Sequence, residues 1–415
     1  MTPLDPDCFA AGDAPMTLAA AQDLVARLAR PVATVETVPF AAALGRILAE
    51  NVIAAVDVPG FDNAAVDGYA LAAADLAPAG ETRLPVAGRA AAGHPLATPH
   101  SPGTTVRILT GAAVPPGCDT VVMQEDCRLE GATVVLPAGV RPGSHVRRAG
   151  EDVRAGTPVL AAGTRLDAAG LALAAAAGRA ALAVRARLGV AVLSTGDEVR
   201  EPGRPLGPGA LYDSNRAMLV ALLAGLGFCV TDLGIVPDDA RALRLVLEGA
   251  AKGHDLILAS GGVSVGEEDH VRGVVASLGT LHAWRVAVKP GRPVAFGQVG
   301  RVPFVGLPGN PAAALVTFLM LARPLALGLA GAAPLPPRGF PVRAAFAYNK
   351  RLGRREFLRA RLAVRDGLAA AERVPGDGAL SGLVAADGLV DLPEDAVRVA
   401  EGDPVVFIPL GEALR

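Results

Sequence analysis

Cysteine is scarce in this chain, and the scarcity excludes two classes of protein. Its four cysteines are Cys8, Cys118, Cys127 and Cys229, and no two of them form a C-x-x-C pair. A disulfide scaffold needs a denser set of cysteines, and a zinc cage needs closely spaced pairs of ligands. We therefore expect reduced thiols in a cytoplasmic protein.

Excess positive charge and a membrane-directed segment are also lacking. The formal net charge is −2 at pH 7, whereas a nucleic-acid binder normally carries a basic stripe. The first residues include Asp5 and Asp7 and show no basic region followed by an apolar one, as a signal peptide would. The most apolar run, residues 312–333, is interrupted by Arg323-Pro324. We expect a buried helix there, and no nucleic-acid or membrane partner.

Apolar residues are abundant, and their patterns change along the chain. The 415 residues are 51% hydrophobic, which is enough for about two to four domains with their own cores. In residues 187–329, apolar runs such as Val190–Leu193 and Leu256–Leu258 alternate with helical patterns, expected at about 214–226, 238–251 and 311–327. This rhythm predicts a parallel sheet with helices on both faces.

The remaining segments predict smaller domains. Residues 52–146 consist of short alternating runs between Pro- and Gly-rich turns, which favours β structure. Helices are expected after Thr17, at about 39–50, and from Asp167 to about Gly178, and we expect them to pack together. The predicted fold class is multidomain α/β plus β, with a discontinuous mixed linker domain (15–51 and 147–184), an inserted β-rich domain (52–146), a central α/β domain (185–330) and a C-terminal all-β domain (338–413).

A glycine-rich acidic loop, S-G-G-V-S-V-G-E-E-D at residues 260–269, follows one of the apolar runs. A strand, a glycine turn and a helix start together form a layout in which backbone N–H groups cradle a phosphate. The acids Glu267, Glu268 and Asp269 would repel a bare phosphate, which suggests a bridging Mg²⁺. The alternative is a tight turn whose acids cap the helix and face water.

Three further loops follow strands of the same predicted sheet, at residues 194–198, 212–215 and 307–311. The first offers hydroxyls for phosphate oxygens and the carboxylates of Asp197 and Glu198 for a metal ion. The other two can also be explained as helix starts, because they contain favoured cap residues. Since ligands bind outside the carboxyl ends of parallel strands, the loops together predict a nucleotide-sized pocket.

Two other regions carry candidate chemistry. Lys289 and Arg292 flank a Pro-Gly turn and could both face a tetrahedral anion, although a hairpin turn with solvated charges is the alternative. The β-rich region holds Asp62 and Asp67 among small residues, and turn chemistry would account for them as well.

The ordered motifs resemble those of the molybdopterin molybdenumtransferase family, which includes bacterial MoeA and the gephyrin E domain. They are F-D-N-x-A-x-D-G-Y-A, T-G-x-x-x-P-x-G-x-D-x-V-V-M-Q-E, G-E-D, S-T-G-D-E, Y-D-S-N, S-G-G-V-S-V-G-E, K-P-G-R-P and L-P-G-N-P. The resemblance covers about residues 15–410. It implies an elongated homodimer of four-domain subunits. It also implies a Mg²⁺-dependent insertion of molybdate into adenylated molybdopterin (molybdopterin-AMP), with release of AMP.

The resemblance also implies roles for individual residues. Active-site acids fall on Asp67, Asp152, Glu198, Asp238 and Asp269, although Asp238 also fits the N-cap of the next helix. Metal ligands fall on Asp197, Glu198, Glu267 and Asp269. Substrate and nucleotide contacts fall on Thr110, Gly111, Ser194, Thr195, Gly196, Asp213, Asn215, Ser260, Gly261, Gly262, Ser264, Gly266, Pro308, Gly309 and Asn310. Molybdate or anion contacts fall on Lys289, Arg292, Arg355, Arg359 and Ser381.

The chain departs from the family pattern at a few positions. Arg292 stands in place of a lysine and Ala313 in place of a serine, while Ala64 and Val66 replace a serine and a methionine. The first two changes affect how molybdate would be bound. Implied protein partners are the upstream molybdopterin adenylyltransferase and the apo-molybdoenzymes or their chaperones. The alternative functions are the adenylyltransferase step itself and a non-catalytic scaffold or carrier. The retained acids argue against the scaffold, and the inserted and C-terminal β domains argue against the adenylyltransferase.

Overall fold

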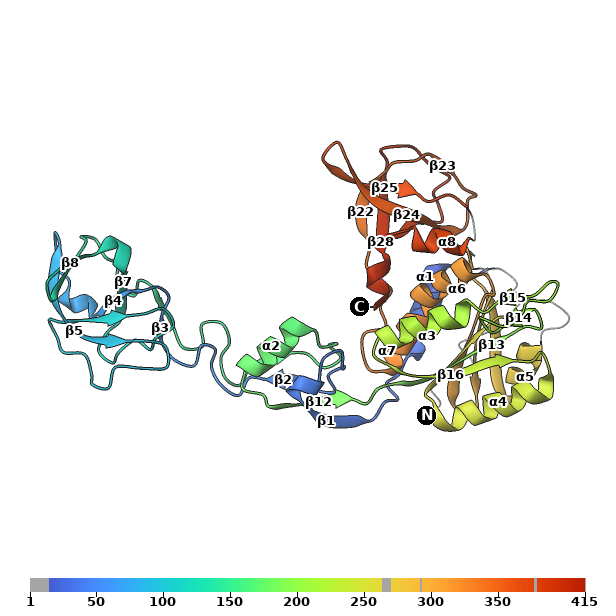
Figure 1. Cartoon of the computed structure of the whole chain (residues 1–415), viewed down its shortest axis with the longest axis horizontal. Helices are drawn as coiled ribbons and strands as arrows, with labels where there is room; N and C mark the ends of the chain where they lie inside the picture. The colour runs from blue at the N-terminus through green and yellow to red at the C-terminus, as the bar shows by residue number, and fades with distance from the viewer. Residues whose placement is uncertain (1–14, 263–269, 292, 377–378, 415) are drawn as a thin grey trace.

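The computed structural model describes residues 15–262, 270–291, 293–376 and 379–414, and the description below is confined to them. The molecule is elongated, with a β-rich domain at one end and an α/β domain at the other (Figure 1). A small mixed domain lies between them, and the C-terminal β domain stands beside the α/β domain (Figure 1). The multidomain α/β plus β class predicted from the sequence is confirmed, while the domain boundaries stay predictions.

The mixed domain is built mainly from short paired strands. β1 (Val35–Pro39) pairs antiparallel with β12 (Ala181–Arg185), and β2 (Val52–Ile53) pairs with β11 (Pro158–Leu160). α2 (Ala168–Ala176) begins where expected, since the Asp167 carboxylate accepts a hydrogen bond from the Gly170 N–H.

The helix expected at about 39–50 is not formed, and that prediction is wrong. Residues 40–42 make a single 3-10 turn directly after β1, and no α-helix follows before β2. Gly45 has φ of +72°, a left-handed conformation that an α-helix does not contain. Pairing with β12 and this glycine turn therefore override the helical pattern of the apolar residues.

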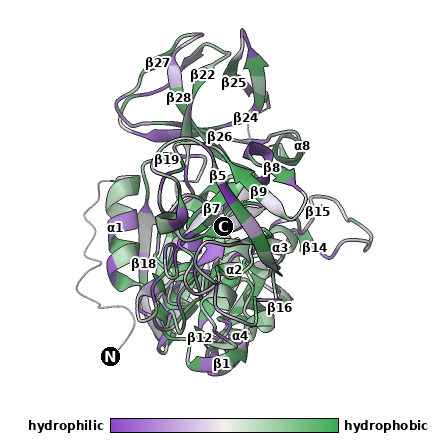
Figure 2. Ribbon diagram, turned by 90° about the vertical axis from the view of Figure 1, so that its left-hand side faces the viewer, coloured by the Kyte–Doolittle hydropathy of each residue, from purple (hydrophilic) through white to green (hydrophobic). Residues whose placement is uncertain are grey.

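α1 (Leu18–Leu28) also differs from the expectation, in its packing. Its N-cap is Thr17, as predicted, with the hydroxyl accepting from the Ala20 N–H. The ribbon of α1 carries both hydrophilic and hydrophobic residues (Figure 2). Its buried apolar residues join the core of the α/β domain. α1 therefore packs with the α/β domain and not with residues 150–182.

The β-rich domain is a six-stranded sheet in the order β7-β4-β6-β5-β9-β8. All its pairings are antiparallel except that of β5 with β6. The strands are β4 (Gly68–Leu71), β5 (Thr82–Ala90), β6 (Thr105–Ile108), β7 (Thr120–Met123), β8 (Arg128–Glu130) and β9 (Thr133–Leu136). A separate ladder of β3 (Asn63–Ala64) and β10 (Val146–Arg147) lies at its base.

The α/β domain has a six-stranded sheet in the order β16-β13-β17-β21-β20-β18. Its strands are β13 (Gly189–Thr195), β16 (Cys229–Val236), β17 (Leu256–Ser260), β18 (Gly279–Arg285), β20 (Pro293–Val299) and β21 (Val302–Leu307). The first four strands in this order are parallel, as predicted, whereas β20 runs antiparallel to both of its neighbours, β21 and β18. The sheet is therefore mixed.

Helices cover both faces of this sheet, as predicted. They are α3 (Asn215–Gly225), α4 (Ala240–Gly253), α5 (His270–Leu278), α6 (Pro311–Thr317) and α7 (Arg323–Leu329). Along β13, Val190 and Val192 join the core under α3 and α6, whereas Ala191 and Leu193 join the core under α4 and α5. This alternation is the pattern of a strand buried on both sides.

The apolar run at the end of the domain forms one continuous helical segment. α6 and α7 are joined by a π-helical stretch, Phe318–Ala322. The whole segment, Pro311–Leu329, is long and apolar enough to cross a membrane, but it is entirely buried inside the fold. The predicted buried helix is confirmed.

The C-terminal domain is a β sheet in the order β19-β24-β25-β22-β28-β26, closed by a pairing of β24 with β26. Its elements are β22 (Phe340–Ala344), β24 (Arg355–Arg365), β25 (Leu368–Arg373), α8 (Leu380–Val384), β26 (Gly388–Leu392) and β28 (Pro404–Pro409). β19 (Val288–Lys289) comes from the α/β domain, so its pairing with β24 ties the two domains together.

Candidate functional site

The loops at the carboxyl ends of the parallel strands converge on the first residue of α3. The Asn215 side-chain NH₂ donates to the Ser260 hydroxyl at 2.9 Å and to the Gly309 carbonyl at 2.8 Å. Ser260 ends β17, and Gly309 lies between β21 and α6. Gly309 and the buried Pro308 precede Asn310, which caps α6 through the Ala313 N–H as predicted. Three of the predicted loops therefore meet at one amide.

The fourth loop, at residues 194–198, supplies two buried hydroxyls that have no hydrogen-bond partner among the described residues. Ser194 and Thr195 end β13 and are each 2% exposed. Their hydroxyls, and the amide oxygen of Asn215, make no hydrogen bond within the described part of the chain. Buried polar atoms are normally satisfied, so these atoms point to a bound ligand with complementary groups.

Two glycines allow the loops to approach each other. Gly261 and Gly262 have φ of +87° and +63°, which favours glycine. A Cβ on Gly261 would lie 2.5 Å from the Thr195 carbonyl oxygen, and one on Gly262 would lie 2.5 Å from the Thr195 hydroxyl. The backbone after β17 therefore lies directly against the end of β13, in the layout that can cradle an oxyanion. Ser264 and Gly266 lie outside the described residues.

Exposed carboxylates stand at the rim of these loops. Asp197 and Glu198 follow Gly196 and are exposed, and Asp197 accepts from the Asp238 N–H at 3.4 Å. Within the described ranges, no three His, Cys, Asp or Glu side chains gather as a metal site. Mg²⁺ is commonly held by one or two carboxylates plus substrate phosphates, and Asp197 and Glu198 fit that kind of site. Glu267 and Asp269 lie outside the described residues.

The structure bears on two further predicted acids, Asp213 and Asp238. Both carboxylate oxygens of Asp213 accept hydrogen bonds from Arg216, so Asp213 binds the protein itself. The N-cap of α4 is Asp239, whose carboxylate accepts from the Ala242 N–H at 2.7 Å. The capping alternative considered for Asp238 is therefore wrong, and the carboxylate of Asp238 stays a candidate for the site.

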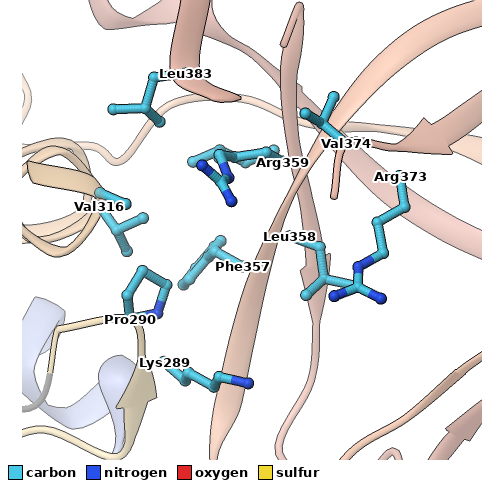
Figure 3. Close-up of a pocket in the computed structure, with 11 residues that line it drawn as sticks. Lys289, Pro290, Val316, Phe357, Leu358, Arg359, Arg373, Val374 and Leu383 are labelled. Carbon is cyan, nitrogen blue, oxygen red and sulfur yellow. The ribbon is translucent and has the colours of Figure 1, made fainter. Parts of the chain in front are cut away.

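A pocket lies between α6 and the C-terminal domain (Figure 3). Its apolar lining is Pro290, Ala312, Val316, Phe357, Leu358, Val374, Leu383 and Leu389. Its charged lining is entirely cationic and consists of Lys289, Arg359 and Arg373. Such a pocket suits a small anion. α6 lines this pocket, and its N-cap, Asn310, belongs to one of the converging loops. The pocket and the loops therefore share α6.

Lys289 is held by a buried carboxylate. Its ammonium lies 3.7 Å from Glu356 and 3.4 Å from the Tyr348 hydroxyl, which donates to Glu356 at 2.8 Å. Burial alone would raise the pKa of Glu356, but bonds from Tyr348 and Arg354 and the charge of Lys289 lower it. Glu356 therefore stays ionised and holds the Lys289 ammonium in place.

The other predicted anion contacts are placed differently. Arg355 pairs with Asp391 through two 2.7 Å bonds and does not line the pocket, so its contacts do not favour the predicted role. Arg359 lines the pocket but donates to the carbonyls of Gly376 and Ala379. Ser381 is exposed on α8. Arg292 lies outside the described residues.

Asp67 is the prepared acid of the β-rich domain. One of its oxygens accepts from both the N–H and the hydroxyl of Thr110, each at 2.7 Å. These bonds, with a smaller effect of the Arg107 charge, lower the pKa of Asp67 below its usual 3.8. Gly111 follows Thr110 with a left-handed φ of +79°, which turns the chain beside the acid.

Asp67 lies in a different domain from Glu198 and Asp238. It belongs to the β-rich domain, whereas Ser194, Glu198 and Lys289 belong to the α/β domain at the opposite end of the molecule (Figure 1). Asp152 is exposed in the segment between the β-rich and mixed domains. A single chain therefore presents two separate halves of the predicted site.

A group of charged residues around Arg216, at the start of α3, was not predicted from the sequence. Arg216 forms ion pairs with Asp213, Asp232 and Glu201. The three-residue spacing of Asp213 and Arg216 at a helix start is a signal that could have identified one of these pairs. The other two partners, Asp232 on β16 and Glu201 after Arg200, are too far from Arg216 in the sequence for spacing to identify them.

Three family profiles match the chain in order. The MoeA N-terminal region (domain I and II) matches residues 16–178, a probable molybdopterin binding domain matches residues 191–327, and the MoeA C-terminal region (domain IV) matches residues 341–410. Together these matches extend over most of the described chain.

Named proteins and solved structures are similar over nearly the whole length. A molybdopterin molybdenumtransferase of Haemophilus influenzae is 37% identical over 90% of this chain and 93% of that protein. Molybdopterin molybdenumtransferase 2 of Mycobacterium tuberculosis is 39% identical over 91% and 94%. The crystal structure of a molybdopterin biosynthesis moeA protein of Pyrococcus horikoshii OT3 has a TM-score of 0.80 at 28% identity, covering 95% of this chain and 100% of that chain.

Proposed function

Because this chain belongs to the molybdopterin molybdenumtransferase family of molybdenum cofactor biosynthesis, we propose that it inserts molybdate into adenylated molybdopterin. The two dithiolene sulfurs displace oxygen from molybdate as water, a water molecule hydrolyses the phosphoanhydride to the nucleotide, and AMP leaves while molybdopterin keeps its phosphate. The observation that carries this proposal is the set of buried polar atoms of Ser194, Thr195 and Asn215, at the end of β13 and on α3, that have no hydrogen-bond partner among the described residues.

The converging loops suit the nucleotide half of the substrate. The Ser194 and Thr195 hydroxyls can donate to phosphate oxygens, and the backbone at Gly261 and Gly262 can approach them closely. Asp197 and Glu198 would hold Mg²⁺, which when bound neutralises charge that develops on the phosphates. Donors fixed before the reaction stabilise such charge without reorganising.

The cationic pocket suits molybdate. Lys289 is oriented by Glu356 and Tyr348, and the apolar floor of Phe357 and Leu383 limits the water around a bound anion. The pocket shares α6 with the nucleotide loops, so both substrates would be held on one scaffold.

The separation of Asp67 from these loops supports a homodimer. In a head-to-tail pair of elongated chains, the β-rich domain of one subunit would lie beside the α/β domain of its partner and complete the site. We further propose a cytoplasmic location, delivery of the substrate by a molybdopterin adenylyltransferase, and transfer of the product to apo-molybdoenzymes or their chaperones.

The direct test is AMP release by the purified protein, given molybdopterin adenylate and Mg²⁺, with and without molybdate. Molybdate-dependent release, together with a product that reconstitutes an apo-molybdoenzyme, supports the insertase. Formation of molybdopterin adenylate from molybdopterin and ATP would favour the adenylyltransferase alternative. Tight binding without turnover would favour a scaffold or carrier.

The first mutational prediction concerns Asp67. Asp67→Asn keeps the size of the side chain but removes its charge, and we expect insertion to be abolished while the protein stays folded. Glu130→Gln is the matched control, because Glu130 is an exposed acid on the same domain, paired only with Arg83 and Arg128. An Asp67→Asn protein that releases AMP at the native rate would overturn the catalytic assignment.

A further inference from the structure

The Arg216 cluster, which consists of Arg216, Asp213, Asp232 and Glu201, lies behind the nucleotide loops. Nε of Arg216 donates to Asp213 at 2.8 Å, Nη1 to Asp232 at 2.5 Å, and Nη2 to both oxygens of Glu201 at 2.6 and 2.7 Å. Every nitrogen of the guanidinium is thus bonded to a carboxylate, and one of the three contacts is bidentate.

The cluster is anchored on the side of α3. Arg216 is 8% exposed and Asp213 is 5% exposed, whereas the side chains of Glu201 and Asp232 are nearly half exposed. Burial opposes the charge of Arg216, but the three carboxylates outweigh that effect and raise its pKa. The guanidinium therefore stays charged and fixed, and Glu201 is the partner that reaches in from the loop.

Glu201 links this anchor to the proposed metal-binding carboxylates. It directly follows β14 (Val199–Arg200), which itself follows Asp197 and Glu198. β14 pairs only with the two-residue strand β15 (Leu211–Tyr212), and most of residues 197–212 are exposed. A segment with so few buried contacts has little else to hold it in one position.

The same turn of α3 also holds the other loops. Asn215 precedes Arg216 and bonds to Ser260 and Gly309, so adjacent residues face the phosphate-side loops and the carboxylate loop. In the described part of the chain, the side-chain bonds of Arg216 go to Asp213, Asp232 and Glu201 and not to Ser194, Thr195 or Asn215. We infer that Arg216 is a positioning residue that, through Glu201, fixes Asp197 and Glu198 relative to the Ser194, Ser260 and Gly309 loops. This inference rests on the proposed function of that site.

Glu201→Gln is the sharpest test, because it removes the charge of the linking residue and leaves the buried Asp213–Arg216 pair intact. Hydrogen–deuterium exchange of residues 196–212 is measured first, and we expect faster exchange than in the native protein. Metal dependence is measured next. We expect the Mg²⁺ concentration for half-maximal AMP release to rise about tenfold, as is typical when a residue that orients metal ligands is lost.

Two further variants separate positioning from general stability. Glu248→Gln removes a similar half-exposed acid, paired with Arg244 on α4, and we expect neither quantity to change. Glu201→Asp keeps the charge on a shorter side chain, and we expect partial recovery of both. A lower melting temperature with native exchange of 196–212 and a native Mg²⁺ dependence would mean a merely structural role and would overturn the inference.

The exchange arm does not depend on turnover. If the native protein releases no AMP, the proposed function fails, and exchange of residues 196–212 with and without Mg²⁺ and AMP still decides the positioning role. If the native protein turns over and Glu201→Gln behaves like Glu248→Gln in both measurements, the function stands and the positioning inference fails. Should Glu201→Gln not fold, Glu201→Ala removes the same link and takes its place.

Discussion

At the scale of the residue, Asp67 shows how local donors prepare a carboxylate. Its bonds from the Thr110 N–H and hydroxyl favour the ionised form and lower its pKa. A carboxylate with a lowered folded-state pKa contributes stability above its unfolded pKa, and this contribution is lost as the pH falls through the folded value. Asp67 therefore stays charged at neutral pH, down to below its usual pKa of 3.8.

Thr110→Val tests this arrangement. The substitution removes the hydroxyl donor and keeps the backbone donor, so we expect the pKa of Asp67 to rise toward its ordinary value without reaching it. Titration of the carboxyl carbon by NMR measures the shift. Thr157→Val is the control, because the Thr157 hydroxyl bonds only to a turn carbonyl. An unchanged Asp67 titration would show that the hydroxyl does not contribute.

Residue types alone could suggest this site but not sort its members. Ser194, Arg355 and Asp213 were all among the ligand contacts expected from the sequence. In the structure the Ser194 hydroxyl has no partner in the described chain, while Arg355 bonds to Asp391 and Asp213 bonds to Arg216. Whether a polar group meets the protein or a ligand depends on neighbours far away in the sequence, which a single sequence does not reveal.

At the scale of the element, the starts of helices were the most predictable feature. Thr17, Asp167 and Asn310 cap α1, α2 and α6 as expected, because a short polar side chain before an apolar repeat satisfies an N–H of the first turn. α4 shows the limit of this reading, since the pattern allowed either acid of the Asp238-Asp239 pair and only the backbone selects Asp239.

Asp239→Ala tests the assignment of that cap. It leaves the Ala242 N–H unsatisfied at the start of α4, so we expect the free energy of unfolding to fall by about 1 kcal/mol. Denaturant unfolding measures the change. Asp239→Asn is the control, because asparagine caps about as well as aspartate. If Asp239→Ala unfolds like the native protein, the cap does not stabilise α4 in solution.

The elements that the sequence did not predict depend on long-range pairing. The apolar pattern of residues 39–50 resembles a helix, but the preceding residues pair with β12 and Gly45 turns the chain. Likewise, β18 and β20 run antiparallel at the edge of a sheet whose apolar strands look alike in sequence. Strand direction follows from the connections between strands, and periodicity carries no information on it.

At the scale of the whole molecule, the elongated shape explains why no single chain completes the proposed site. The β-rich domain with Asp67 and the α/β domain with Glu198 stand at opposite ends, joined by the narrow mixed domain (Figure 1). Motif order along the chain could not show this separation. Chemistry that needs both halves therefore requires a second chain.

Complementation between two inactive variants tests this requirement. Asp67→Asn damages only the β-rich half and Glu198→Gln only the α/β half. If sites form between subunits, a mixed dimer contains one site with both halves intact. Equal co-expression should then restore about a quarter of the native activity, because half of the dimers are mixed and each has one intact site of two.

The complementation result depends on where the halves meet. Each variant alone should be inactive, and mixing either with itself should restore nothing. If both halves came from the same chain, every site in a mixed dimer would carry one damaged half, so activity would stay absent at all ratios. Purification through two different tags, one on each variant, isolates the mixed dimers, so that absent activity in them would place Asp67 and Glu198 in one subunit and rule out the shared site.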